Sequence, residues 1–294
     1  MFDVQSIYQA TSVEDAIRAL CADEKAMIVS GGTDVWVQNR DGRHAGLPFV
    51  SVHGLKEISG VSLLADGTLS IGAATCFTDV TENELIQRYV PMLGEAADQV
   101  GSPQIRNAGT IGGNVCNGVT SADTAPSLFA LDAVLLLRGK GGERRVPIAT
   151  FYAGPGKTVR DRGEVLCRIL IPQESYAGVY GQYIKYGKRN AMEISTLGCA
   201  VTVRLDQSKQ TIERLRIAYG VAAPTPMRCL EAEEACTGRP VTGETVRQAA
   251  DAAVAAIHPR TSWRASKDFR LHLARELCVR AMEQAILKAG GTLK

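Results

Sequence analysis

Arg106-Asn107-Ala108-Gly109-Thr110-Ile111-Gly112-Gly113-Asn114-Val115-Cys116-Asn117-Gly118 is the stretch around which the rest of the sequence is organised. It holds four glycines and three asparagines and no helix-length apolar run, so we expect backbone conformations that residues with a β-carbon avoid. Successive main-chain N–H groups in such a loop form a concavity suited to phosphate oxygens. A long surface loop is the alternative interpretation.

A second glycine turn lies near the N-terminus. The apolar run of residues 26–29 stops at Gly31-Gly32 and restarts as a helix that we expect Thr33 or Asp34 to cap. The first N–H groups of such a helix point at a bound anion. Two loops of this kind are better suited to a cofactor that carries a pyrophosphate than to a ligand that carries a single phosphate.

Two common nucleotide motifs are absent. Gly109, Gly112 and Gly113 read G-x-x-G-G, which does not match the Rossmann pattern G-x-G-x-x-G. Residues 154–158 read G-P-G-K-T, but a phosphate-binding P-loop needs a further glycine at the position of Phe151. We therefore expect neither a Rossmann domain nor an ATP site.

Composition excludes several classes of function. The formal net charge is +2 with both signs mixed, so no broad cationic face predicts binding to nucleic acid or to a membrane. The eight cysteines form no C-x-x-C pair and the four histidines no H-x-x-x-H pair, so we expect no metal site. No secretory signal and no apolar run of ~20 residues is seen, which predicts a cytoplasmic protein.

The first half of the chain has an α+β pattern. Residues 1–55 predict a small β-α-β-α-β unit, whose first helix begins with a capping box at Thr11. Apolar and polar residues alternate on both sides of Asp66-Gly67, which predicts a hairpin. Residues 75–100 read as helical with a break near Pro91. A short helix from Asp123 and a second hairpin over residues 133–148 complete an antiparallel α+β subdomain.

The second half predicts a different architecture. Residues 178–186, 195–206 and 211–221 read as three antiparallel strands, and the rest is helical, with a packed amphipathic helix over residues 266–288. The predicted domains are therefore residues 1–173 and residues 174–294.

The sequence holds four signals in order: residues 28–35, residues 109–114 with Asp123, Lys185 ahead of Ala191-Met192-Glu193-Ile194-Ser195, and residues 259–266. Together these motifs resemble the FAD subunits of molybdenum hydroxylases over essentially the whole chain. The resemblance is closest to the separate FAD-binding subunits of bacterial xanthine dehydrogenases. It implies an FAD-binding domain of the vanillyl-alcohol-oxidase (PCMH) type followed by a C-terminal flavoprotein domain.

The resemblance also implies a set of FAD-binding residues. Lys185 would lie near the pyrimidine end of the flavin, where a cation stabilises negative charge on the reduced ring. A solvent-facing strand lysine is the alternative for Lys185, and a simple helix cap is the alternative for Asp123. The implied residues are Met27, Ile28, Val29, Ser30, Gly31, Gly32, Thr33, Asp34, Val100, Gly109, Thr110, Ile111, Gly112, Gly113, Asp123, Leu166 and Lys185.

In function, the resemblance implies an electron-transfer subunit. FAD would take electrons from a partner subunit with [2Fe–2S] clusters and pass them to NAD, while a molybdopterin-containing subunit hydroxylates the substrate. No catalytic residue or metal ligand is then required in this chain. The closest resemblance favours a purine as the substrate. Nicotinate, an aldehyde and carbon monoxide remain alternatives, because the partner subunit and not this chain would recognise the substrate. A nucleotide-binding assembly subunit without turnover and a free-standing flavin oxidase are the alternatives.

Overall fold

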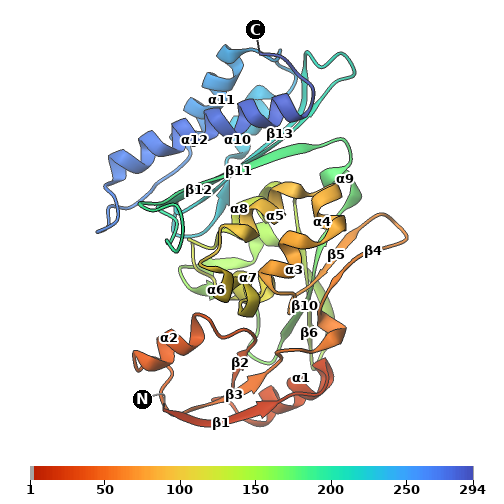
Figure 1. Ribbon diagram of the computed structural model, residues 1–294, viewed down its shortest axis with the longest axis vertical. Coiled ribbons are helices and arrows are strands. Elements are labelled where there is room, and N and C mark those ends of the chain that lie inside the picture. The colour runs from red at the N-terminus through yellow and green to blue at the C-terminus, as the bar shows by residue number, and fades with distance from the viewer. Residues whose placement is uncertain (1–2, 294) are drawn as a thin grey trace.

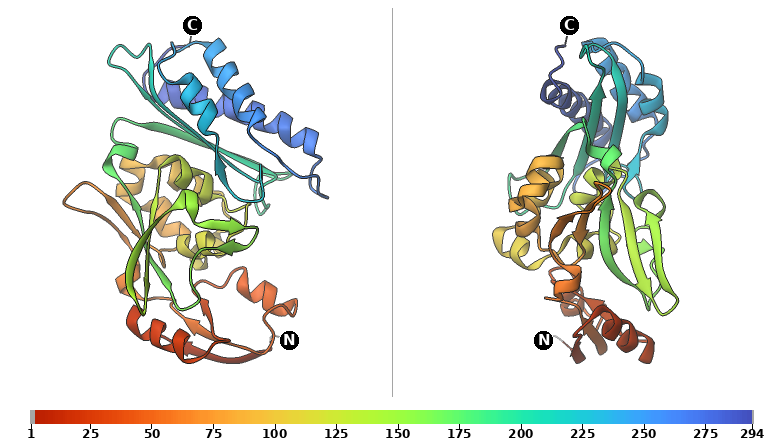
Figure 2. Two further views of the ribbon diagram at one scale, coloured as in Figure 1. Left: turned by 180° about the vertical axis from the view of Figure 1, so that it is seen from behind. Right: turned by 90° about the vertical axis from the view of Figure 1, so that its right-hand side faces the viewer.

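A computed structural model describes residues 3–293. The chain is arranged as three parts along the long axis (Figures 1 and 2). A small unit that begins with the first described strand lies at one end, an α+β part lies in the middle, and a sheet with helices α10 to α12 lies at the other end. None of the described helices combines the length and the apolar character needed to cross a bilayer.

The small unit confirms the predicted β-α-β-α-β order. Its three strands are parallel in the order β1-β3-β2, and α1 buries the apolar face that its spacing predicts. The helix is capped by Ser12, whose side chain accepts from Asp15 N at 3.0 Å, so the cap predicted at Thr11 was one residue early. The elements are β1 (Val4–Gln9), α1 (Val13–Ala22), β2 (Met27–Val29), α2 (Val35–Arg40), β3 (Leu47–Ser51) and the 3-10 helix η1 (Lys56–Ile58).

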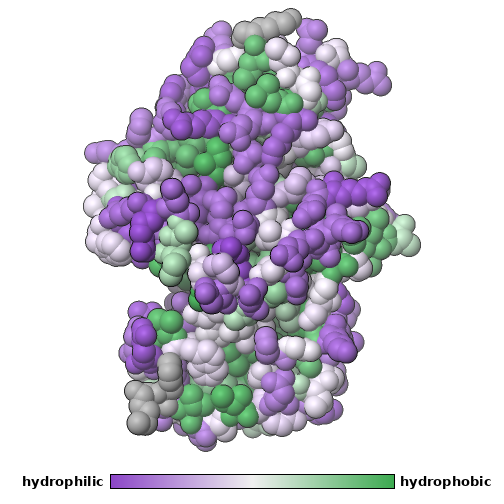
Figure 3. Space-filling model, in the orientation of Figure 1, coloured by the Kyte–Doolittle hydropathy of each residue, from purple (hydrophilic) through white to green (hydrophobic). Residues whose placement is uncertain are grey.

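The middle part is built on an antiparallel sheet of order β4-β5-β10-β6-β7. Both predicted hairpins form, and β10, which was not predicted from the sequence, joins them through the centre of the sheet. The tip of the β4–β5 hairpin carries half-exposed Leu63 and Leu64. This hairpin forms a hydrophobic projection in Figure 3. The elements are β4 (Val61–Leu63), β5 (Leu69–Gly72), β6 (Val134–Gly139), β7 (Gly142–Pro147), η2 (Ile148–Thr150), β8 (Tyr152–Gly154), β9 (Lys157–Thr158) and β10 (Val165–Ile171).

Short helices cover this sheet. Residues 75–100 form three helices rather than two, because the Asn83 side chain accepts from Leu85 N at 3.0 Å and starts a new helix there. Pro91 begins the third, which confirms the predicted break. The helices are α3 (Phe77–Glu82), α4 (Glu84–Tyr89), α5 (Pro91–Asp98), α6 (Pro103–Ala108), α7 (Ile111–Cys116) and α8 (Thr124–Ala130).

The glycine-rich stretch differs from the expectation of an irregular loop. It folds as α6 and α7, and Gly118, with φ of +69°, is its one glycine in the left-handed region. Gly112 is required for another reason, since a β-carbon there would lie 2.5 Å from the Ala73 carbonyl oxygen. Close packing, rather than backbone conformation, therefore demands glycine in α7.

The C-terminal part confirms the three predicted strands and adds a fourth. Alternate residues of β12 face opposite ways: Cys199 and Val201 pack among the C-terminal helices, whereas Ala200 joins the core of the middle part. The sheet is thus covered on both faces. Its elements are α9 (Gln173–Tyr176), β11 (Tyr180–Tyr186), β12 (Leu197–Leu205), β13 (Ile212–Gly220), β14 (Met227–Arg228), α10 (Leu230–Cys236), α11 (Gly243–Ala255) and α12 (Lys267–Lys288).

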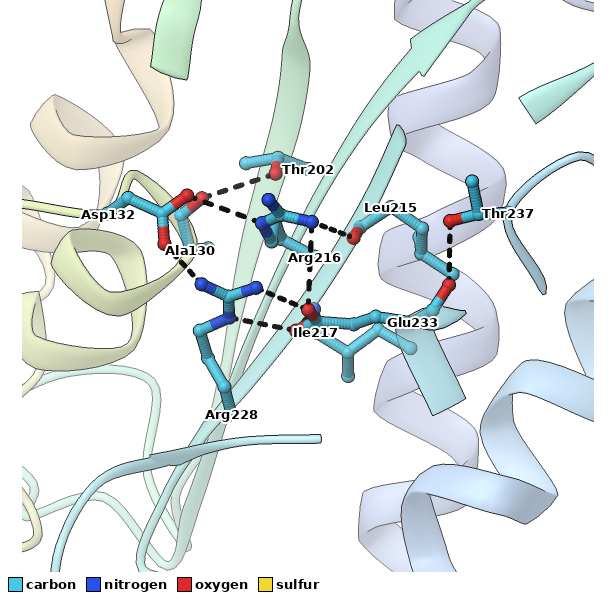
Figure 4. A network of polar contacts seen from close by, with 9 residues as sticks. All are labelled: Ala130, Asp132, Thr202, Leu215, Arg216, Ile217, Arg228, Glu233 and Thr237. Atoms are coloured by element: carbon cyan, nitrogen blue, oxygen red, sulfur yellow. Dashed lines mark hydrogen bonds and ion pairs between the residues drawn. The ribbon is translucent and has the colours of Figure 1, made fainter. Parts of the chain in front are cut away.

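A charged network fastens the middle part to this sheet (Figure 4). Asp132, in the turn between α8 and β6, accepts from Arg216 Nε at 3.3 Å and also pairs with Arg228. Glu233 of α10 pairs with Arg228 as well, and accepts from the main-chain N–H of Ile217 at 2.9 Å. The network fixes the position of the turn before β6 against β13 and α10.

Candidate functional site

The fold brings the two glycine turns into contact, as the pyrophosphate interpretation requires. A β-carbon on Gly31 would lie 1.8 Å from the Ala108 carbonyl oxygen, so only glycine allows the two main chains to approach this closely. Asn117 Nδ2 donates to Asp34 Oδ2 at 2.8 Å and joins the far ends of the turns. Sequence segments about 80 residues apart therefore form one surface.

The first turn supplies free hydrogen-bond donors. In residues 3–293 we find no acceptor for the main-chain N–H groups of Gly31, Gly32 and Thr33, which lie between β2 and α2. The hydroxyl of Ser30 is buried and also lacks a partner in that part of the chain. Gly32 has φ of +69°, which suits the turn. Free amides beside an unsatisfied buried hydroxyl are a donor set suited to an anion.

The second turn plays a different part from the one that the sequence predicts. The N–H groups of Ile111 and Gly112 donate to Thr75 O and Ala73 O at 3.0 and 2.9 Å, and that of Gly113 donates to Thr110 Oγ1 at 3.2 Å. These amides are satisfied within the protein. The second turn is therefore a rigid wall beside the first, and the expectation that its N–H groups cradle a phosphate is wrong for these three.

A second cluster surrounds Asp123. Its carboxylate accepts from Lys185 Nζ at 2.8 Å and from the Tyr183 hydroxyl at 3.0 Å, and the Asp123 and Lys185 side chains are each only 9% exposed. Burial raises the pKa of the Asp123 carboxyl above its ordinary value, and Lys185 and Tyr183 offset part of that rise. Asp123 precedes α8 without capping it, so the helix-cap alternative fails. The solvent-facing alternative for Lys185 fails too.

One contact ties this cluster to the second glycine turn, and another ties it to the end of α5. Thr124 Oγ1, at the start of α8, donates to Asn114 Oδ1 of α7 at 2.6 Å. Lys185 Nζ also donates to the carbonyl of Gln99 at 2.9 Å, which places it beside Val100. Leu166 differs from the rest, since it is 4% exposed within the core on β10.

Sequence reasoning missed Tyr183 and Asn117. Tyr183 precedes Lys185 by two positions on one strand, so the alternation of a strand predicts that both side chains leave the same face. That signal was available. Asn117 gave no such signal, because its partner Asp34 is remote in sequence.

Other candidate motifs do not join the site as nucleotide or metal ligands. The G-P-G-K segment is the hairpin between β8 and β9 and does not lead into a helix, which agrees with the rejection of a P-loop. Within the described residues, no group of three or more His, Cys, Asp or Glu side chains is placed to hold a metal ion.

Comparison with known proteins then settles the family. The family described as the FAD binding domain in molybdopterin dehydrogenase matches residues 2–174, and the CO dehydrogenase flavoprotein C-terminal domain matches residues 182–285. This chain belongs to the FAD-binding subunits of molybdopterin dehydrogenases. The family assignment and the α+β fold predicted from the motifs are thus confirmed.

Known proteins match most or all of this chain. The chain is 41% identical to the xanthine dehydrogenase FAD-binding subunit of Escherichia coli O157:H7 over 294 residues, which is all of both chains. It is 32% identical to the carbon monoxide dehydrogenase medium chain of Hydrogenophaga pseudoflava over 80% of each. A solved carbon monoxide dehydrogenase structure from that organism matches with a TM-score of 0.92 at 29% identity, covering 98% of this chain and 99% of the other.

The cofactor of the subunit is FAD, and the observed residues fit it. The free amides and the unsatisfied Ser30 hydroxyl suit pyrophosphate oxygens. Gly31 permits the close main-chain approach that brings the two turns together. Asp123 and Lys185 supply a fixed pair of charges in a buried setting.

Proposed function

We propose that the FAD-binding subunit passes electrons from [2Fe–2S] clusters of one partner subunit to NAD, within an assembly whose molybdopterin-containing subunit hydroxylates xanthine. The observation that carries the choice of xanthine is the 41% identity, over the full length of both chains, to a xanthine dehydrogenase FAD-binding subunit. Relatives named for carbon monoxide, glyceraldehyde and nicotinate dehydrogenases are 26–32% identical over 76–95% of this chain.

Each glycine turn has its own role in this proposal. The first turn binds the pyrophosphate, and its donors are the free amides of Gly31, Gly32 and Thr33. The whole segment assigned to this role is Met27, Ile28, Val29, Ser30, Gly31, Gly32, Thr33 and Asp34. The second, Gly109, Thr110, Ile111, Gly112 and Gly113, forms the wall along the ribityl chain. The satisfied amides of α7 support this division, because they keep the wall rigid whether or not a ligand is bound.

The buried ion pair orients and tunes the flavin. Bound FAD supplies the redox chemistry, taking electrons singly and releasing a hydride. Lys185 is held by Asp123 and by the Gln99 carbonyl, so its ammonium has a fixed position from which to stabilise negative charge on a reduced ring. Val100 is the neighbour of Gln99, so it provides apolar surface beside Lys185, whereas Leu166 supports the site from within the core. None of these groups transfers a proton, so the chain needs no catalytic acid or base.

We also propose that the subunit divides into domains at residues 1–173 and 174–294. The two family matches, which end at residue 174 and begin at residue 182, support a boundary here. The flavin site then lies where the domains meet, because Asp123 belongs to the first and Lys185 to the second.

The experiment is a reconstitution. The purified chain is expected to be yellow, with absorbance near ~450 nm, and to oxidise NADH with an artificial acceptor but not to hydroxylate xanthine. Addition of the molybdopterin and [2Fe–2S] subunits is expected to give xanthine-dependent reduction of NAD. A colourless chain that still assembles would instead identify an assembly subunit without turnover. Xanthine turnover by the isolated chain, free of molybdenum and iron, would also contradict the proposal.

A further inference from the structure

An exposed aromatic and basic surface lies outside the residues assigned to FAD. Trp263, Met192 and Ile194 are 76%, 65% and 51% exposed, and Lys188 and Arg264 lie against the Trp263 ring. We call these five residues the Trp263 patch. They come from two segments, the connection between β11 and β12 and the segment before α12, which lie side by side in Figures 1 and 2.

The indole of Trp263, in the segment before α12, contacts one cationic side chain from each of the two segments. The guanidinium carbon of Arg264 lies 4.2 Å from the ring centroid, and Lys188 Nζ lies 5.2 Å from it. Both separations are within the range of cation–π attraction. The two cations restrain this large exposed ring, so it loses less entropy on binding a partner than an unrestrained side chain would.

The charge of these segments is unbalanced. Within residues 3–293, no carboxylate lies within ion-pair distance of Lys188, Arg260, Arg264 or Lys267. Residues 187–194 and 258–270 together carry six cationic side chains and two acidic ones, namely Lys188, Arg189, Arg260, Arg264, Lys267 and Arg270 against Glu193 and Asp268.

Beneath this surface, Arg270 is a buried cation without a counter-charge. It is 2% exposed and donates to the carbonyl of Arg260 and, at 2.8 Å, to Ser262 Oγ. Its Nε has no acceptor in the described part of the chain, and neither does the buried Nε of Arg264. Neutral oxygens alone compensate Arg270, so negative charge brought to the patch from outside would be attracted strongly.

The patch adjoins the candidate flavin site. The main-chain N–H of Met192 donates to the carbonyl of Gly101 at 3.2 Å, next to Val100. Tyr186, the neighbour of Lys185, packs edge-on against Phe269 at 5.7 Å between ring centroids.

We propose that the Trp263 patch docks an acidic face of the electron-donating partner subunit, an inference that rests on the proposed function. Charge complementarity argues for carboxylates on that face. The exposed Met192 and Ile194 call for an apolar surface as well, which a dinucleotide does not offer. Trp, Arg and Met are enriched in the energetically dominant parts of protein interfaces. Proximity to the flavin site suits a partner that must deliver electrons over a short gap.

Binding of the purified [2Fe–2S] subunit to the FAD-loaded chain tests this directly. Trp263→Ala and Lys188→Glu are each expected to raise the dissociation constant for the [2Fe–2S] subunit at least ~10-fold. Added salt should weaken wild-type binding, and Lys188→Glu should reduce that dependence. Lys140→Glu, a matched charge reversal on the exposed β6–β7 turn, should bind like wild type. Flavin content and NADH oxidation with an artificial acceptor should be unchanged, since Trp263 and Lys188 lie outside the proposed FAD site.

The outcomes separate this proposal from the proposed function. If Trp263→Ala and Lys188→Glu bind the partner as tightly as wild type, or if wild type does not bind it, the docking proposal is overturned. A raised KM for NADH with unchanged partner binding would assign the patch to a dinucleotide and overturn it too. A chain that binds the partner through the patch but carries no flavin would uphold the docking and refute the electron-transfer role.

Discussion

Replacing Gly31 by alanine is expected to separate the two glycine turns. The added methyl would lie 1.8 Å from the Ala108 carbonyl oxygen, whereas ordinary contact begins at 3.4 Å, so the main chains must move apart by about 1.6 Å. Backbone on both sides leaves no flexible side chain to yield. Overpacking of this kind costs about 1–3 kcal/mol. The free protein can relieve that strain by letting the turns part, but FAD needs them together.

The strain is therefore expected to appear as lost affinity for FAD. A cost of 1–3 kcal/mol corresponds to about 5- to 150-fold weaker binding. The assay is titration of flavin-free protein with FAD, together with the flavin-to-protein ratio after purification. Gly141→Ala is the matched control, because it has open space and no positive φ. Wild-type affinity in Gly31→Ala, with the fold intact, would refute the argument that close approach of the turns forms the site.

Two further predictions concern charged groups. Lys185→Met should lower the flavin reduction potential, because the reduced ring loses the ammonium that stabilises its negative charge. An unchanged potential in redox titration, with FAD still bound, would place Lys185 away from the ring. Glu233→Gln should destabilise the protein by about 2–4 kcal/mol in denaturant unfolding, because it removes a carboxylate from Arg228 in the network of Figure 4. Glu234→Gln, exposed on the same helix, should cost almost nothing, and equal costs would contradict the network's role.

Periodic segments of the fold could be predicted from sequence. The apolar spacing of α1 and α12 and the turn at Asp66-Gly67 are local signals, and all three elements formed where expected. The position of β10 was not predictable in this way, because a strand buried on both faces shows no alternation. The extra break at Asn83 was missed although its capping signal is local.

The site was harder to predict than the fold. Glycine content pointed to both turns but not to the reason for each glycine, since a close approach such as that of Gly31 to Ala108 depends on a contact between distant segments. The main-chain N–H groups of α7 were likewise expected to be free for a phosphate, and they are not. Whether an amide is free depends on its tertiary partners, and Thr75 and Ala73 satisfy those of α7. The sequence could not show that Lys185 and Asp123 meet, although the family resemblance named both.

The central claim is that this chain carries the flavin through which electrons leave the assembly. The most direct test is anaerobic addition of xanthine to the assembled three-subunit complex while absorbance near ~450 nm is followed. The flavin should bleach, and it should recover when NAD is added. A complex without the [2Fe–2S] subunit should show no bleaching. Xanthine hydroxylation that proceeds with the flavin fully oxidised throughout, or at an undiminished rate in a complex stripped of FAD, would contradict the account.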